Sequence, residues 1–222
     1  MPIPDPAATV LLLRPHGERF EVLMVQRNSR GFFGSLLVFP GGGVHRIDSD
    51  SEDFREDDLA HRRAAVRELA EETGILLTTD GAVAAPGLKD SDLYRWMAKR
   101  GHTAAVDDLT MVSRWVTPPG APRRFDTRFY LVGCEHVPDV VIDTDELVAH
   151  QWVDPRTALD RHAAGELEMM LPTTAHLSWL SRWTSIDDAV MSAAGADGRT
   201  AIRPARAEDG SFVPVHIPAG GG

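Results

Sequence analysis

The sequence is poor in cysteine: Cys134 is the only one among 222 residues. One thiol allows no internal disulfide and no cysteine-rich zinc site. The sequence also lacks long apolar runs. The first six residues contain no basic side chain, and the longest apolar run near them, Val10 to Leu13, is too short for a signal peptide or a membrane span. We therefore expect a cytoplasmic protein without a membrane partner.

The sequence also contains fewer basic than acidic residues. The chain has 23 lysines and arginines against 33 aspartates and glutamates, a formal net charge of -10. This balance argues against broad electrostatic binding of nucleic acid, so no nucleic-acid partner is expected. It does not exclude a phosphate-bearing small molecule, because a bound cation can reverse the local sign of the charge. The nine histidines include no pair at metal-ligand spacing on a helix.

The remaining composition is that of an ordinary soluble globular protein, and its patterning predicts a mixed α/β fold. Periodicity and turn residues predict strands at residues 8–14, 20–27, 36–39, 109–117, 124–134 and 148–153, the first two forming a hairpin. They predict helices at residues 58–73, 93–99, 155–164 and 172–183. We expect one domain at residues 1–192 with its core at 8–185, and an extended tail at 193–222 with a strand near 212–215. Residues 44–58 are acidic and resemble an exposed insert.

The helix at residues 58–73 carries the most informative residues. Glu68, Glu71 and Glu72 are spaced i, i+3, i+4 and share one face. Asp57 or Asp58 suits the start of this helix, and Gly74 suits the left-handed position after its end. Three like charges on one face indicate either a solvated acidic surface or a site for a hard divalent cation. The spacing alone favours the first.

A glycine run upstream reverses that preference. Residues 40–43, Pro-Gly-Gly-Gly, follow a short buried strand and allow backbone conformations closed to other residues. Pro40-Gly41-Gly42, followed by Arg67-Glu68-Leu69-Ala70-Glu71-Glu72-Thr73-Gly74-Ile75, resembles the Nudix hydrolase signature. That signature is Gly-x5-Glu-x7-Arg-Glu-U-x-Glu-Glu-x-Gly-U, with U an aliphatic residue. The resemblance covers about residues 8–185 and implies an α/β/α sandwich with a mixed sheet and a central metal-binding helix.

The first half of the signature departs from the family pattern. Counting back from Arg67 puts the signature glycine at Asp53 and its glutamate at Leu59, so the acidic insert separates the glycines from the helix. The early glutamate has no evident equivalent. Asp57 and His61 lie on the same helical face as Glu68 and are candidates to replace it in part.

A branch of this family has a long insert after Phe-Pro-Gly-Gly and includes enzymes that cleave coenzyme A and its esters. Three stretches resemble that branch: Val38 to Gly42, Arg27-Asn28-Ser29-Arg30, and Arg123 to Phe129. The resemblance implies hydrolysis of a diphosphate in a nucleotide-derived small molecule. Coenzyme A or an acyl ester is one version. ADP-ribose, nucleotide sugars and damaged nucleotides are others.

The resemblance also implies roles for particular residues. Mg²⁺ or Mn²⁺ would be held by Glu68, Glu71 and Glu72 with a carbonyl of Gly42 or Gly43. Arg67 would orient a carboxylate. The general base would be Glu71, Glu72 or an acid from a loop. Glu146 is the candidate from a loop, and the alternative is that Glu146 is only a solvated turn residue. Phosphate contacts are expected from three arginines, for each of which a structural ion pair is an equal alternative: Arg27, Arg30 and Arg128.

Two other functions compete with diphosphate hydrolysis. One is a non-catalytic Nudix domain that senses a nucleotide-derived ligand; it is disfavoured because the signature carboxylates are present and no helical module follows residue 193. The other is RNA decapping, which the acidic charge disfavours. A homodimer stays open as an alternative to a monomer.

Overall fold

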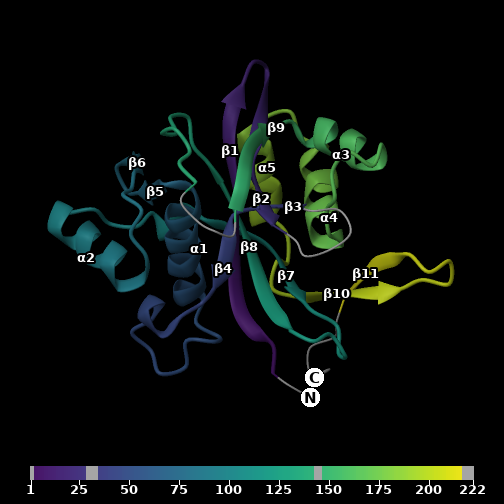
Figure 1. Cartoon of the computed structure of the whole chain (residues 1–222), viewed down its shortest axis with the longest axis horizontal. Coiled ribbons are helices and arrows are strands. Elements are labelled where there is room, and N and C mark those ends of the chain that lie inside the picture. Colours follow the sequence, from purple (N-terminus) through teal and green to yellow (C-terminus); the bar gives the residue numbers. More distant parts are fainter. Residues whose placement is uncertain (1–2, 29–34, 143–146, 217–222) are drawn as a thin grey trace.

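The computed structural model describes residues 3–28, 35–142 and 147–216, which are built around a mixed β-sheet (Figure 1). The strand order is β11-β10-β7-β8-β1-β2-β3, with β4 paired to β1 and β9 to β2. The strands of this sheet are β1 (Asp5–His16), β2 (Arg19–Asn28), β3 (Ser35–Val38), β4 (Gly41–Gly43), β7 (Thr110–Val116), β8 (Phe125–Gly133), β9 (Leu147–Val153), β10 (Ala201–Arg206) and β11 (Phe212–His216). A separate hairpin consists of β5 (Ile75–Thr78) and β6 (Gly81–Ala84).

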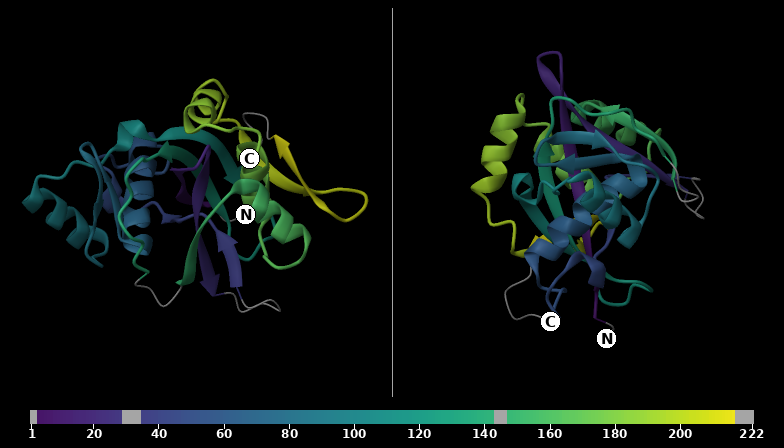
Figure 2. Two further views of the ribbon diagram at one scale, coloured as in Figure 1. Left: turned by 90° about the horizontal axis from the view of Figure 1, so that it is seen from above. Right: turned by 90° about the vertical axis from the view of Figure 1, so that its left-hand side faces the viewer.

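Helices lie on both sides of the sheet (Figure 2). They are α1 (Asp58–Thr73), α2 (Asp90–Arg100), α3 (Pro155–Ala163), α4 (Leu171–Leu180) and α5 (Ile186–Ala194), with the short 3-10 turns η1 (Arg46–Asp48) and η2 (Val106–Asp108). The expected hairpin, the expected strands and the helix at residues 58–73 are all present. The predicted α/β/α sandwich with a mixed sheet is thereby confirmed.

Strand β1 shows why the sheet is covered on both faces. Val10 and Leu12 are fully buried in a core that contains much of α1. Leu11 and Leu13 are fully buried in a second core, together with residues of α4 and α5. Successive side chains of a strand point to opposite faces, so a continuous apolar run fits a strand that is buried on both sides. This run is therefore the centre of the fold.

The segments around the sheet differ from the sequence-based prediction in three places. Helix α5 was not predicted, and the segment after residue 193 contains the hairpin β10–β11 rather than only extended chain. Strand β10 pairs in parallel with β7, and β11 falls where a strand was expected. Helix α2 runs from Asp90 to Arg100 with Lys89 as its N-cap residue, so it begins earlier than the helix predicted at residues 93–99.

The acidic insert is the third difference. It was expected to be exposed, but Val44 and Asp48 within it are buried, the latter completely. A buried carboxylate needs a partner, and Asp48 finds one in helix α1. The insert is thus anchored to the core by a charge that its sequence gave no reason to bury. Of the helices in the described part of the chain, none combines the length and the apolar character needed to cross a lipid bilayer.

Candidate functional site

Helix α1 presents three glutamates to a pocket, and its ends explain its placement. Asp57 is the N-cap and accepts a hydrogen bond from the amide of Leu59 at 3.0 Å. Gly74 ends the helix in the left-handed region, with φ of 69°. Both roles were predicted from the sequence. The apolar side of α1 packs in the core, which leaves the glutamate face toward β4.

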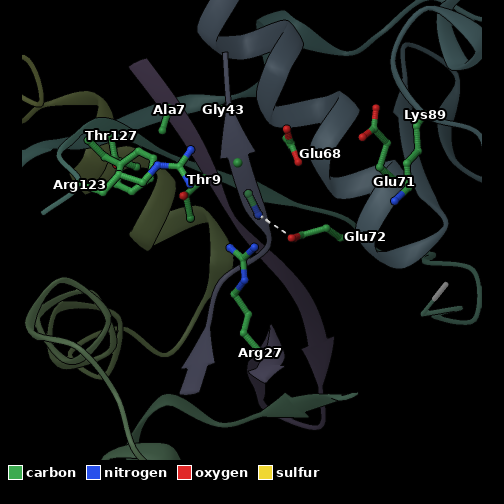
Figure 3. Close-up of a pocket in the computed structure, with 13 residues that line it drawn as sticks. Ala7, Thr9, Arg27, Gly43, Glu68, Glu71, Glu72, Lys89, Arg123 and Thr127 are labelled. Atoms are coloured by element: carbon green, nitrogen blue, oxygen red, sulfur yellow. Dashed lines mark hydrogen bonds between the residues drawn. The ribbon is translucent and has the colours of Figure 1, made fainter. Parts of the chain in front are cut away.

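The glycines of β4 allow this face to approach the sheet closely. A Cβ atom on Gly42 would lie 2.5 Å from the carboxyl carbon of Glu68, and one on Gly41 would lie 2.4 Å from the carbonyl oxygen of Ala8. The amide of Gly41 donates a hydrogen bond to Glu72 Oε2 at 2.9 Å (Figure 3). Any side chain at Gly42 would displace the Glu68 carboxylate, so glycine is required here by contact rather than by flexibility.

Arg67 is fully buried and ties the insert, the glycine strand and the glutamates together. Its Nε and Nη2 donate to the two carboxylate oxygens of Asp48 at 2.9 and 3.1 Å. Its Nη2 also donates to the carbonyl of Gly43 at 2.7 Å. Its Nη1 donates to Glu68 at 2.8 Å and Glu71 at 3.3 Å. Arg67 thus contacts two of the three glutamates from a buried position, and its role in orienting a carboxylate stays a prediction.

Asp48 is the residue that the sequence-based reasoning missed. It was sought by counting back from Arg67, across the insert. Counting forward from Gly42, it stands six positions on, where the signature has its early glutamate. Asp57 and His61, the suggested replacements, have other roles: Asp57 caps α1, and His61 is buried with its Nδ1 against the Asp57 carbonyl at 2.8 Å. In this alignment Asp48 takes the place of the early signature glutamate, and the extra residues of the insert follow Asp48.

The electrostatics of this cluster are set by burial and by crowding of like charges. Burial, opposed by Arg67 and reinforced by Glu71, holds the pKa of Glu68 above its usual range. Burial alone would lower the pKa of Arg67, but its hydrogen bond to Asp48 and the charge of Glu68 raise it. Arg67 is therefore a permanent cation that partly offsets the carboxylates. Tyr94, from α2, completes the buried group with a hydrogen bond from its hydroxyl to Asp48 at 2.7 Å.

The pocket in front of the glutamates has a volume of about 590 Å³, within the range of small-molecule sites. Its wall is made by the three glutamates and the β4 glycines together with cationic side chains. Arg27, a predicted phosphate ligand, is among these cations. Lys89 and Arg123 also line the pocket and were not predicted as site residues. Figure 3 shows Arg27 and Arg123 on the strand side of the pocket and Lys89 on the helix side.

Lys89 reaches the pocket because the start of α2 is anchored there. The next residue, Asp90, has φ of 50°, which is uncommon for a residue with a side chain. Its amide donates to Glu71 Oε1 at 2.6 Å, and its carboxylate lies 3.1 Å from Nδ1 of His45. No sequence pattern pointed to Lys89, since the loop before α2 is distant in the chain from both halves of the signature.

Among the other predicted site residues, the described Arg128 is not part of the wall of this pocket. Arg128 is buried and its guanidinium pairs with Asp58 at 3.2 Å and Glu56 at 3.5 Å, which is the structural alternative considered for it. Arg30 and Glu146 lie outside the described residues, so their roles stay predictions.

The donor set suits a hard divalent cation, since carboxylate and carbonyl oxygens are what Mg²⁺ and Mn²⁺ prefer. Each glutamate is nevertheless engaged by the protein: Glu68 by Arg67, Glu71 by the amide of Asp90, and Glu72 by the amide of Gly41. Within residues 3–28, 35–142 and 147–216, no three carboxylate, imidazole or thiol groups converge closely enough to hold an ion as they stand. The donors fit in kind, and their convergence on an ion would require these side chains to rotate.

Comparison with known proteins identifies the class. Residues 51–180 match the family model of the NUDT19 Nudix domain, which is more than half of the chain. A solved structure of a NUDIX hydrolase from Alicyclobacillus acidocaldarius superposes with a TM-score of 0.73 at 31% identity, covering 86% of this chain and 97% of that one. The chain belongs to the Nudix hydrolase family, and the resemblance predicted from its signature is confirmed.

Two curated relatives are more specific. The chain is 31% identical over 186 residues to the putative nudix hydrolase 7 of Caenorhabditis elegans, which covers 79% of this chain and 60% of the relative. It is 26% identical over 239 residues to the human acyl-coenzyme A diphosphatase NUDT19, which covers 78% of this chain and 64% of the relative. The chain thus spans less than two thirds of the length of these curated relatives.

Proposed function

We propose that this protein hydrolyses a diphosphate linkage in a nucleoside diphosphate joined to another group, with coenzyme A or its acyl esters as the substrate. The observation that carries the proposal is the single pocket that combines Glu68, Glu71 and Glu72 with cations on its opposite sides. Such a pocket can accept a diphosphate while keeping carboxylates beside it. The name of the human relative, an acyl-coenzyme A diphosphatase, supports this choice of substrate.

In the proposed reaction, water attacks one phosphorus atom, a new P–O bond forms and the bridging P–O bond breaks. The products are two phosphate monoesters, and the water gives up a proton. Negative charge grows on the phosphoryl oxygens during this step, and positive groups aimed at them lower its barrier. We expect Arg27, Lys89 and Arg123, which line the pocket, to neutralise that charge. Either Glu71 or Glu72 is proposed to take the proton of the water, with Glu146 as the predicted alternative.

Mg²⁺ or Mn²⁺ is the proposed cofactor. Glu68, Glu71 and Glu72, with a carbonyl of Gly42 or Gly43, would hold it. When bound, such an ion polarises phosphoryl oxygens and acidifies water. The Gly43 carbonyl accepts a hydrogen bond from Arg67, which also pairs with the carboxylates of Glu68 and Glu71. The proposed role of Arg67 is therefore to fix the relative positions of these three oxygen ligands.

The test is hydrolysis of a substrate panel in Mg²⁺ or Mn²⁺, with products resolved by chromatography. The panel contains coenzyme A, acyl-coenzyme A, ADP-ribose, NADH and nucleoside triphosphates. We expect release of adenosine 3′,5′-bisphosphate from coenzyme A or its ester, and a fall of about a hundredfold or more in Glu72→Gln. Glu166→Gln is the matched control, because the Glu166 side chain is exposed and, among the residues that the structure describes, pairs only with Arg161.

Equal turnover by the wild type and Glu72→Gln would contradict the assignment of the glutamates. Turnover of another panel member, but not of coenzyme A or its ester, would reject the proposed substrate and retain the proposed diphosphate hydrolysis. No turnover of any member would favour a domain that binds its ligand without cleaving it.

A further inference from the structure

A second cavity, of about 260 Å³, adjoins the glutamate pocket. The two share wall residues on four strands, namely Thr9 on β1, Arg27 on β2, Gly41 on β4, and Phe125 and Thr127 on β8. Because they share a wall, a molecule whose diphosphate lies beside the glutamates can extend into the second cavity without leaving the protein surface. The second cavity is therefore a candidate for a neighbouring part of the same substrate.

The chemistry of the two cavities differs sharply. The second has an aromatic lining that comes from β7, from β8 and from the residue directly after β3: Phe39, Trp115, Phe125 and Phe129. Among the described residues that line it, none is acidic, and Arg27 at the shared wall is the only charged one. Threonines also line this cavity, among them Thr117 and Thr173. A cavity with aromatic faces and a few hydroxyls suits a flat, uncharged ring that stacks and forms hydrogen bonds at its edge.

The outer part of this cavity comes from the C-terminal third of the chain. Met170 and Pro172 at the start of α4 contribute to it, and so does Pro204 of β10. Strand β10 is held in place by its parallel pairing with β7, where Ile202 faces Trp115. Pro204 lies beyond residue 180, where the family match ends. This wall is thus a feature of the chain that the family match does not include.

We propose that this aromatic cavity binds the purine base of the nucleotide half of the substrate, with the β10–β11 hairpin as its outer wall. The proposal rests on the proposed function, since it assumes that a diphosphate occupies the neighbouring pocket. In coenzyme A only a ribose separates the base from the diphosphate. An acyl chain is separated from it by the whole polar pantetheine arm, so it could not begin in a cavity that shares a wall with the glutamate pocket.

The experiment measures binding of the two product halves separately, by isothermal titration calorimetry. The probes are adenosine 3′,5′-bisphosphate and 4′-phosphopantetheine. Phe125→Leu keeps an apolar side chain but removes the ring. We expect it to weaken binding of the bisphosphate about tenfold, as for loss of one base–aromatic stack. Because Phe125 also borders the glutamate pocket, we expect phosphopantetheine to be weakened as well, but by no more than about threefold.

A matched proline pair tests the hairpin wall. Pro204 and Pro214 face each other in the register of β10 and β11, but only Pro204 is among the residues that line the cavity. Pro204→Ala should weaken binding of the bisphosphate about fourfold, through loss of buried methylene contacts, and Pro214→Ala should not.

The proposal is overturned if neither half binds, or if Phe125→Leu weakens phosphopantetheine and spares the bisphosphate, which would put the pantetheine arm in the cavity. It is also overturned, for the hairpin, if both proline variants behave alike. The proposed function fails separately: bisphosphate binding that depends on Phe125, without hydrolysis of any diphosphate, would support this inference and reject the reaction.

Discussion

Arg67 shows how much of this site depends on one buried cation. Its side chain and that of Asp48 have no exposed surface, and the guanidinium contacts Glu68, Glu71 and the Gly43 carbonyl as well. A buried guanidinium is tolerated only if its hydrogen bonds and charge are matched. The same contacts that satisfy it hold two of the pocket glutamates in place. Stability and function are therefore coupled at this residue.

Asp48→Asn tests that coupling. It keeps the shape of the side chain and removes the charge that faces Arg67. We expect the free energy of unfolding to fall by about 3 kcal/mol, the usual cost of breaking a buried ion pair from one side. Urea denaturation at pH 7 measures it.

The control for this variant is Asp50→Asn, two residues along the insert. Asp50 pairs with Arg63 at 3.0 Å, but its side chain is 92% exposed. Exposed pairs contribute about 1 kcal/mol or less, so little change is expected. A similar fall in the free energy of unfolding in both variants would mean that the buried Asp48–Arg67 pair stabilises the fold no more than an exposed pair does.

Asp48 also illustrates what a sequence pattern can and cannot supply. The spacing from Gly42 is visible in the sequence and would have identified it. What the spacing cannot reveal is that residues after it loop out while Asp48 itself turns inward to a residue nineteen positions later. Lys89 is the opposite case, because it has no pattern at all. It reaches the pocket because the amide of the next residue, Asp90, donates a hydrogen bond to Glu71, which also lines the pocket.

At the scale of elements, the site consists of one helix face against one short strand. Helix α1 was predicted from residue 58 to residue 73, and the structure has the same bounds, because its caps and its apolar stripe are local signals. Strand β4 was not among the predicted strands. Its pairing with β1, from Ala7–Gly43 to Thr9–Gly41, is a contact between distant segments that no local pattern encodes.

Gly42→Ala tests the contact between these two elements. The added methyl group would lie 2.5 Å from the Glu68 carboxyl group and must push it away. Since a displacement of about 1 Å at a reacting group can cost about a hundredfold in rate, we expect a fall of that order in kcat/KM for the substrate found in the panel.

Gly195→Ala serves as the control, because a Cβ there meets only ordinary contacts at 3.6 and 3.9 Å. Its activity should match that of the wild type. Full activity in Gly42→Ala would show that the Glu68 carboxylate can take another position without loss.

For the whole molecule, the second core contains a group that links stability to pH. His176 is fully buried on α4, where its ring stacks on Phe129 at 4.3 Å. Its Nδ1 lies 2.6 Å from the carbonyl of Pro172, which can only accept, so Nδ1 carries the proton. Its Nε2 then accepts from the hydroxyl of Ser113 at 2.7 Å. The neutral imidazole is satisfied on both sides, and burial lowers its pKa to about 4.

This lowered pKa predicts a loss of stability in mild acid. The unfolded chain binds a proton at the histidine near pH 6.5, and the folded protein only near pH 4, so stability is complete above pH 6.5 and falls as the pH drops between these values. At pH 5 the loss from this group is about 2 kcal/mol. Urea denaturation at pH 7 and pH 5 measures it.

His176→Gln provides the comparison, because it cannot titrate in this range. Whatever its stability at pH 7, the free energy of unfolding of this variant should fall less between pH 7 and pH 5 than that of the wild type. An equal loss in both proteins would assign the pH dependence to other groups, such as His61, whose pKa burial also lowers.

The sequence by itself determined the class of fold, the extent and caps of α1, and the shared face of Glu68, Glu71 and Glu72. These features depend on periodicity and on residues close in the chain. Only the tertiary structure decided that Asp48 neutralises Arg67, that Lys89 and Arg123 line the glutamate pocket, and that Pro204 walls the aromatic cavity beside it. Each of these brings together residues that are distant in sequence, and such contacts depend on how the sheet and its helices pack.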